Sequence, residues 1–429
     1  MLTYFCDGVY MSCTPKKIAF CFPYRGVGGV SLLFVRIATE IAKKNNIEVF
    51  VVDYEDGFMA KHKPDSVGFI LYSDNAPCYL PNGVSVVFQT MTPWSIFPSL
   101  KFHNDTKLFF WNCHPYNLVP HVPLIDEKLK SYRIFNRLFL KTILYPYWKK
   151  CRRFLELLIA RDAISFMDAS NKSVTEFFYF SLNISEYLPI PAVLPDNLKT
   201  FKKELTKADI IKVTWVGRIV DFKYFILKYT LRELDKICFQ IDREIVFTVI
   251  GGGGFDERLK SDAKNLKYIN VEYIEHIEPD VLDQYLCDNC DLMFAMGTSA
   301  LEAAKLSIPT VLLDVFYSEL KGCYQYRFLF ERDGSTLGDV LNGKDLKRHI
   351  RNVRDPYNVS LMNIFKQLQD DYGLISKKTK DYFLKNHDIK QVSNDLLEKI
   401  KISRCTYKDL KETSSTERGV FYRLKKILN

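Results

Sequence analysis

The sequence predicts an α/β protein made of two doubly wound domains. Two series of short apolar strands, each followed by a helical pattern, are separated by the proline-rich passage Leu188–Asn197. The 429 residues, 47% of them hydrophobic, are enough for two cores of ordinary size. We therefore expect one domain at 16–190, a linker at 191–207 and a second domain at 208–374.

The first domain opens with a strand, a loop and a helix. The strand is Lys17–Phe22, and apolar residues at helical spacing predict a helix over Ser31–Lys43. Because strands alternate with helices, we expect parallel pairing through right-handed crossovers. Further strands of this domain are expected at Glu48–Asp53, Val84–Gln89 and Leu108–Trp111.

The loop after the first strand carries Arg25, Gly26, Gly28 and Gly29. It lies at the carboxyl end of that strand, where doubly wound sheets bind ligands. Glycines let a backbone approach a phosphate or a sugar closely, although a plain tight turn explains them about equally well.

The second domain contains a strand, turn and helix with the composition of an anion site. Gly297, Thr298 and Ser299 form the turn, and Glu302 follows on a helix expected at Ala300–Leu306. Amides at a helix start attract phosphate, and a carboxylate one turn further can accept hydrogen bonds from a sugar diol. The alternative is that Thr298 and Ser299 only cap the helix and that Glu302 is an ordinary exposed acid. The strands of this domain are expected from Ile210 onward and at Ile245–Ile250, Asn270–Tyr273, Asp291–Phe294 and Thr310–Asp314.

Two cations, Arg218 and Lys223, follow Gly217 at the end of the first strand of the second domain. Their spacing suits two separate contacts to one diphosphate, whose charge must be stabilised when it departs. Taken alone, two cations in a loop are more often exposed to solvent.

In this order along the chain, the motifs resemble those of the GT-B glycosyltransferases. The likeness is to bacterial hexosyltransferases that build surface polysaccharides and carry a glycosyl transferases group 1 type C-terminal domain. The layout matches over 16–400. The motif detail lies in Val213–Lys223, Phe247–Phe255, Val271–His276 and Gly297–Asp314.

The resemblance implies two Rossmann-like, doubly wound domains facing a cleft. It also implies a nucleotide-sugar donor, either a UDP-, a GDP- or a dTDP-sugar, bound by the second domain. It assigns the diphosphate to Arg218 and Lys223, the ribose to Glu302 and the nucleotide base to the neighbourhood of His276. Since the two cations replace the divalent ion of other transferase folds, no metal or other cofactor is expected to be required.

One departure from the family concerns stereochemistry. Many retaining members carry an earlier glutamate in the motif that ends at Glu302, and here that position is Phe294. Both the retaining and the inverting outcome therefore stay open.

Catalytic candidates in the first domain are less specific. His114 follows a strand, where it could face the transferred sugar, but a lone histidine is more often a packed or surface residue. Asp53, Asp56 and Asn112 compete with it as acceptor contacts or as the base.

After Asp314 we expect helices rather than strands. The resemblance implies that a helix at 375–400 crosses back onto the first domain and leaves 401–429 as a basic tail. Val392, Leu396 and Ile400 supply an apolar stripe for that packing.

Two segments, Tyr132–Arg161 and Phe421–Leu428, mix basic and apolar side chains as interfacial surfaces do. They favour a lipid-linked acceptor, and the alternative is that both pack on the protein's own core. No signal peptide is visible at the N-terminus Met1–Cys6, and whether Met1 or Met11 begins the chain stays open. No apolar run approaches the roughly 20 residues that span a bilayer. We expect a cytoplasmic protein, and a peripheral position at the inner face of the cell membrane stays open.

The leading interpretation is a glycosyltransferase of O-antigen, capsule or lipopolysaccharide biosynthesis that uses a glycan or lipid-linked acceptor. A sugar-nucleotide epimerase of the same fold and a catalytically silent partner subunit that binds nucleotide or glycan are the alternatives. The net charge of +9 comes with no recognition motif, so nucleic-acid binding is not expected.

Overall fold

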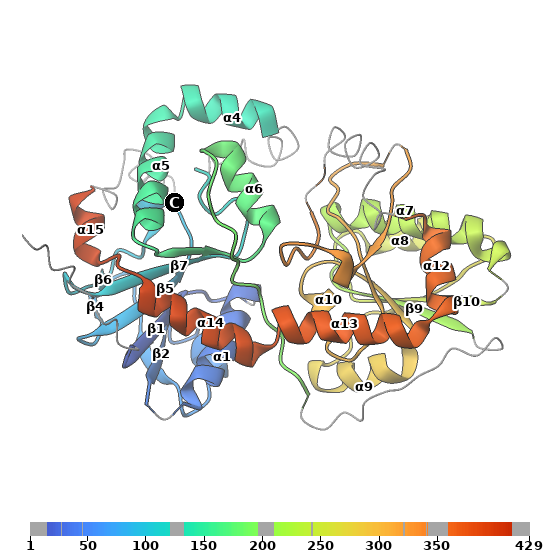
Figure 1. Ribbon diagram of the computed structural model, residues 1–429, viewed down its shortest axis with the longest axis horizontal. Coiled ribbons are helices and arrows are strands. Elements are labelled where there is room, and N and C mark those ends of the chain that lie inside the picture. Colours follow the sequence, from blue (N-terminus) through green and yellow to red (C-terminus); the bar gives the residue numbers. More distant parts are fainter. Residues whose placement is uncertain are drawn as a thin grey trace, which may run out of the picture.

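The computed structural model describes residues 15–413 except Val27, Asn45, 121–132, 196–209, Asp242, Lys321, Val340 and 342–358. Within these residues the chain forms two six-stranded sheets, each with helices on both faces (Figure 1). We call the parts built on the first and the second sheet the N-terminal half and the C-terminal half. The predicted α/β architecture of two doubly wound units is confirmed.

The sheet of the N-terminal half has the order β3-β2-β1-β5-β7-β8, and all of its strands are parallel. This is the strand order of a dinucleotide-binding fold, in which the direction of winding reverses between β1 and β5. The strands are β1 (Lys17–Cys21), β2 (Glu48–Asp53), β3 (Gly68–Leu71), β5 (Val84–Gln89), β7 (Lys107–Asn112) and β8 (Ile164–Phe166), with β4 (Cys78–Tyr79) and β6 (Leu100–Lys101) paired separately.

Apolar cores on both faces hold this sheet, as its parallel strands require. One core joins the strands to α1 (Gly29–Ala42), α2 (Phe58–His62) and α14 (Ile389–Ile402). The other joins them to α5 (Tyr145–Ala160), α6 (Ala169–Phe178) and α15 (Tyr407–Glu412), with α4 (Arg133–Thr142) at the outer end. A short helix, η1 (Pro93–Ser95), completes this half.

The sheet of the C-terminal half repeats the same order as β11-β10-β9-β12-β13-β14. Its winding reverses between β9 and β12, and only the β13–β14 pair of the described strands is antiparallel. We expected helices alone after Asp314, so the strand β14 corrects that expectation. The strands are β9 (Ile211–Val216), β10 (Ile245–Ile250), β11 (Asn270–Ile274), β12 (Leu292–Ala295), β13 (Thr310–Leu312) and β14 (Arg327–Phe328).

Two apolar cores also cover this second sheet. One contains α7 (Asp221–Ile237), α8 (Asp256–Ala263) and α12 (Leu361–Asp370). The other contains α9 (Pro279–Asn289), α10 (Thr298–Ala304) and α13 (Tyr372–Asn386). Two short helices, η2 (Cys238–Gln240) and η3 (Leu329–Glu331), lie in its connections.

The chain returns from the second sheet to the first through α13 and α14. Helix α13 buries Phe383 in a core of the C-terminal half, whereas α14 buries Val392, Leu396 and Ile400 in a core of the N-terminal half. The predicted return onto the first sheet is therefore correct. The single predicted helix over 375–400 is wrong, because the chain bends at His387 between α13 and α14 (Figure 1).

The basic segment Tyr132–Arg161 could form an interfacial surface or pack on the protein's own core, and helix α5 distinguishes these alternatives for its part of the segment. Trp148, Phe154, Leu155 and Leu158 of this helix are buried in the core of the N-terminal half. The apolar stripe of α5 is thus core, not a free interfacial face. The second basic segment, Phe421–Leu428, lies outside the described residues. Among the helices that are described, none combines the length and apolar character needed to cross a bilayer.

Candidate functional site

The topology brings Gly217, Arg218 and Gly297 to one point of the second sheet. Strands β9 and β12 are parallel neighbours, with Trp215 opposite Phe294, and the winding reverses between them. Gly217 and Arg218 follow β9, and Gly297 follows β12. In doubly wound sheets, ligands bind beyond the carboxyl ends of the strands at such a reversal point.

Glycines bring the loops after β9 and β10 into backbone contact. Gly217 and Gly251 have φ of +145° and +121°, conformations that side chains rarely adopt. A Cβ on Gly251 would stand 2.7 Å from the carbonyl oxygen of Gly217, and one on Gly253 would stand 2.5 Å from that of Ile219. The glycine run thus supports the loop that carries Arg218.

Lys223 reaches back from the first turn of α7 to the same loop. A Cβ on Gly217 would stand only 3.1 Å from its Nζ atom, which also lies 5.7 Å from the ring centre of Trp215. Burial, and secondly the nearby guanidinium of Arg218, lower the pKa of Lys223 to about 8. Within the part of the chain that the structure describes, neither cation has an ion-pair or hydrogen-bond partner.

The turn before α10 differs from the expectation in two respects. Gly297, with φ of +67°, is itself the N-cap residue, so Thr298 and Ser299 are the first helical residues. The amide of Gly297 donates to the carbonyl of Leu337 at 2.7 Å and is not available to a ligand. The hydroxyl of Ser299 donates back to the carbonyl of Met296 at 3.0 Å. The amides of Thr298 and Ser299 remain as first-turn donors.

Glu302 is not an ordinary exposed acid. One of its oxygens lies 3.7 Å from Nη1 of Arg36 on α1, and the other pairs with Nζ of Lys305. Lys305 is buried and also pairs with Asp283 of α9 at 2.9 Å. Sequence reasoning missed both cations. The spacing of Lys305 from Glu302 on one helix face could have found it, whereas no sequence feature marks Arg36.

The remaining candidates of this half lie in different surroundings. His276 is exposed after β11, an edge strand, and its Nε2 lies 3.2 Å from a carboxylate oxygen of Glu278. Phe294 is fully buried and packs near Phe247 and Tyr326. The side chain at this position therefore belongs to the core.

The loop after β1 is organised by Tyr24 and Asp56. The guanidinium Nε of Arg25 donates to the carboxylate of Asp56 at 3.0 Å, and Arg25 stacks over the ring of Tyr54 at 3.7 Å. A Cβ on Gly26 would clash with the ring of Tyr24. Gly28 is the N-cap of α1 and Gly29 its first residue, with open space beside it.

Two competitors for a catalytic role in this half, Asp53 and Asn112, are buried. Asp53 is fully buried, and its carboxylate accepts hydrogen bonds from the amides of Tyr24, Tyr54 and Met59 at 2.8, 2.9 and 2.8 Å. This carboxylate therefore holds the loop in place. Asn112 is also fully buried, so it does not reach the surface either. His114 is exposed after β7 and accepts a hydrogen bond from the amide of Tyr116 at 3.3 Å.

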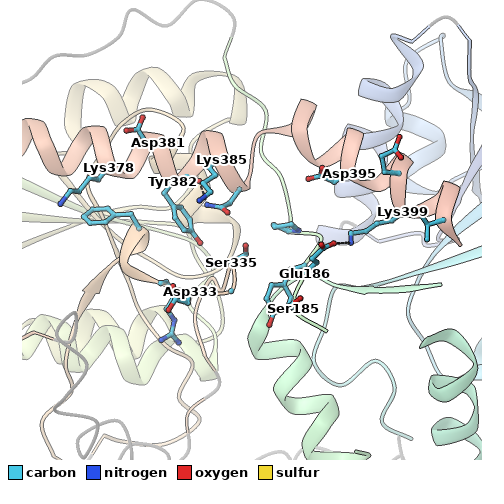
Figure 2. A pocket seen from close by; sticks show the side chains of 18 residues that line it. Ser185, Glu186, Asp333, Ser335, Lys378, Asp381, Tyr382, Lys385, Asp395 and Lys399 are labelled. Atoms are coloured by element: carbon cyan, nitrogen blue, oxygen red, sulfur yellow. Dashed lines mark hydrogen bonds and ion pairs between the residues drawn. The ribbon is translucent and has the colours of Figure 1, made fainter. Parts of the chain in front are cut away.

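A hollow of about 870 Å³ lies elsewhere, at the junction of the two halves. It is lined by residues of the segment before the linker, of the η3 loop and of α13 and α14, among them Glu186, Asp333, Tyr382 and Lys399 (Figure 2). None of the candidate donor residues lines it. Across the described residues there is also no group of three or more His, Cys, Asp or Glu side chains that could hold a metal ion.

Comparison with solved structures identifies the fold. A glycosyltransferase from Rickettsia africae is 13% identical, with 91% of this chain and 98% of that chain covered and a TM-score of 0.53. TarM of S. aureus is 9% identical, with 91% and 99% covered and a TM-score of 0.50. At these identities the likeness shows a shared GT-B fold, as the sequence motifs predicted. No family model and no curated protein matches the sequence.

Proposed function

We propose that this chain is a glycosyltransferase that moves a sugar from a nucleotide-sugar donor to a hydroxyl of a glycan or lipid-linked acceptor. The observation that carries the proposal is the pair Arg218 and Lys223, two cations without an anionic partner among the described residues, held together at the reversal point of the second sheet. One of the two similar solved structures, that from Rickettsia africae, is titled as a glycosyltransferase, which adds support.

The pair calls for an anion on energetic grounds. A cation removed from water loses hydration, and a neighbouring like charge adds repulsion, as the lowered pKa of Lys223 shows. Such an arrangement is costly unless a ligand compensates it. A diphosphate carries enough charge to pair with both cations, and the exposed Arg218 can bind its oxygens in a bidentate manner.

The same cations suit the reaction. The acceptor oxygen forms a bond to the anomeric carbon while the bond from that carbon to the diphosphate breaks, and the electron pair leaves with the nucleoside diphosphate. Arg218 and Lys223 would stabilise this growing charge, the part that a divalent ion plays in other transferases. We assign the acceptor's proton to His114, which is exposed at the carboxyl end of β7 and whose Nδ1 would take it in place of the 3.3 Å hydrogen bond from the amide of Tyr116.

The other donor contacts follow from the fold. Glu302 would accept hydrogen bonds from the ribose hydroxyls, the first-turn amides of Thr298 and Ser299 would donate to phosphate, and His276 would lie beside the base. With Phe294 in the core, the proposal includes no carboxylate from β12 near the sugar.

We further propose that the acceptor lies at an anionic membrane surface, as intermediates of surface polysaccharides do. Leu138 and Ile143 are 61% and 70% exposed on and after α4. Lys141 lies beside them. Its pKa is lowered, first by burial and then by the neighbouring charges of Arg137 and Arg152. Exposed apolar side chains among clustered cations suit an interfacial contact.

The test of the donor site is calorimetric titration of the full chain with UDP, GDP and dTDP and their sugars, with and without magnesium. We expect one nucleotide class to bind without metal. Arg218→Ala should weaken that binding by about 10- to 100-fold, since a charge-assisted hydrogen bond contributes about 1.5–3 kcal/mol. Glu302→Gln, which keeps one acceptor oxygen, should weaken it by a smaller factor.

Arg232→Ala is the matched control, because this cation lies on α7 but pairs with Glu319 away from the site. Equal affinity of the wild type, Arg218→Ala and Glu302→Gln would show that the donor binds elsewhere. Binding without transfer to any acceptor would instead favour the silent partner, and conversion of the sugar without acceptor would favour the epimerase.

A further inference from the structure

An ion pair between the two halves stands at the candidate donor site. Nη1 of Arg36 on α1 lies 3.7 Å from Oε1 of Glu302 on α10, with 30% and 17% of the two side chains exposed. Helix α1 packs on the first sheet and α10 on the second, and they flank the place where α13 passes into α14 (Figure 1). The contact therefore depends on how the halves are placed relative to each other.

The second oxygen of Glu302 is held quite differently. It pairs with Lys305, which follows one turn later on the same helix face. Lys305 is buried, pairs with Asp283 of α9 at 2.9 Å, and its carbonyl accepts a hydrogen bond from Nζ of Lys380 on α13. Three helices of the C-terminal half thus fix this side of the carboxylate.

The distances indicate which partner a ligand would replace. A separation of 3.7 Å is beyond hydrogen-bond range, so Arg36 makes a loose contact that water and salt can weaken. A ribose diol offers O–H donors that a carboxylate accepts directly. The oxygen that faces Arg36 is the one free to exchange, because the other is held by buried Lys305.

We propose that Arg36 is a latch: it occupies Glu302 while the donor site is empty and gives way to the ribose of an arriving nucleotide, while Lys305 keeps the carboxylate oriented. This inference rests on the proposed function, because it takes Glu302 as the ribose contact. In the empty enzyme, the contact of Arg36 with Glu302 would then join the two halves, and Glu302 is also the residue that binds the donor. Arg36 competes with the nucleotide and is not one of its contacts.

The first test is nucleotide affinity, measured by calorimetry with the full chain and UDP, GDP and dTDP in turn. Arg36→Ala should bind the preferred nucleotide about 3- to 10-fold more tightly, because a competitor for Glu302 is gone. Lys305→Met should bind it more weakly, because the carboxylate loses its fixed orientation. Lys43→Ala is the control, since Lys43 is the C-cap residue of α1 but pairs with Glu40 of that helix. Weaker binding by Arg36→Ala would make this residue a donor contact and overturn the latch.

The second test needs no nucleotide. Small-angle X-ray scattering of the ligand-free chain at low salt should give a larger radius of gyration for Arg36→Ala than for the wild type. In about 0.5 M salt the electrostatic screening length falls to roughly 4 Å. The radius of gyration of the wild type should then approach that of the variant. If no nucleotide binds the wild type, the proposed function fails, while the scattering still decides whether Arg36 joins the halves. Unchanged scattering together with unchanged affinity overturns the latch.

Discussion

At the scale of single residues, Lys223 should make donor binding depend on pH. Its pKa is lowered to about 8, and a diphosphate binds the charged ammonium. Affinity should therefore fall as the pH rises through 8, by up to about tenfold per pH unit. Calorimetry between pH 7.5 and 9.5 checks this, and Lys223→Met should bind more weakly at pH 7.5 with little further loss at pH 9.5.

Folding stability of the free protein should respond to the same group in the opposite direction. An unfolded lysine has a pKa of about 10.4, so between pH 8 and that value the unfolded chain binds more protons than the folded one. This group then adds stability as the pH rises, because the folded protein loses a buried charge.

A wild-type affinity that stays constant up to pH 9.5 would contradict the assignment of Lys223 to the donor.

Features that are local in the sequence could be predicted at the candidate site, whereas contacts between distant segments could not. Gly217, Arg218 and Lys223 could be predicted because a strand end, a glycine and two cations are local in sequence. The roles of Asp53 and Arg36 could not. Asp53 is held by amides from the neighbouring loop, and Arg36 meets Glu302 only because α14 returns the chain to the first sheet.

At the scale of elements, the long apolar patterns were predictable and the short ones were not. Strands β2, β5 and β10 have the predicted bounds, since six apolar-rich residues between turns are unambiguous. Strand β14 has two residues and no pattern to detect. In α5 the pattern was clear but its meaning was not, because a helix that packs on a core and one that lies on a membrane share the same amphipathic stripe.

The region of α4 still presents apolar and basic side chains after α5 is assigned to the core. Leu138, Ile143 and Tyr145 are exposed there, with Lys141 among them. We expect the chain to sediment with vesicles that contain phosphatidylglycerol and not with vesicles of phosphatidylcholine alone, and to be released by salt. The double variant Leu138→Ser with Ile143→Ser should reduce this binding roughly 30-fold, since burying each side chain in the membrane contributes on the order of 1 kcal/mol.

Phe239→Ser is the control for that experiment, because Phe239 is comparably exposed in the C-terminal half, on η2. Equal loss of vesicle binding in the control and the double variant would indicate a general effect of surface hydrophobicity. Binding that is indifferent to lipid charge would argue against a role of the cations around Lys141.

At the scale of the whole molecule, the two chain passages between the halves are fastened to each other at His387. Its Nδ1 lies 2.7 Å from the carbonyl of Ile190 and so carries the proton, and its own carbonyl accepts from the amide of Ala192 at 3.0 Å. The residue before the linker and the bend between α13 and α14 are thus one structural unit. The sequence indicated neither contact, because they join positions almost two hundred residues apart.

His387 should make this junction sensitive to acid. Its ring is fully buried, and burial lowers its pKa to about 4, whereas an unfolded histidine has a pKa of about 6.5. Between these values the unfolded chain binds the proton and the folded one does not, so stability should be lost as the pH falls from 6.5 toward 4, by at most about 1.4 kcal/mol per unit. In His387→Gln, whose amide can still donate to Ile190, the free energy of unfolding in urea should depend less steeply on pH over this window than in the wild type. The control is His276→Gln, at an exposed histidine, which should retain the wild-type dependence of the unfolding free energy on pH. If His387→Gln also retained that dependence, the acid sensitivity would reside in groups other than His387, the residue that fastens the two halves.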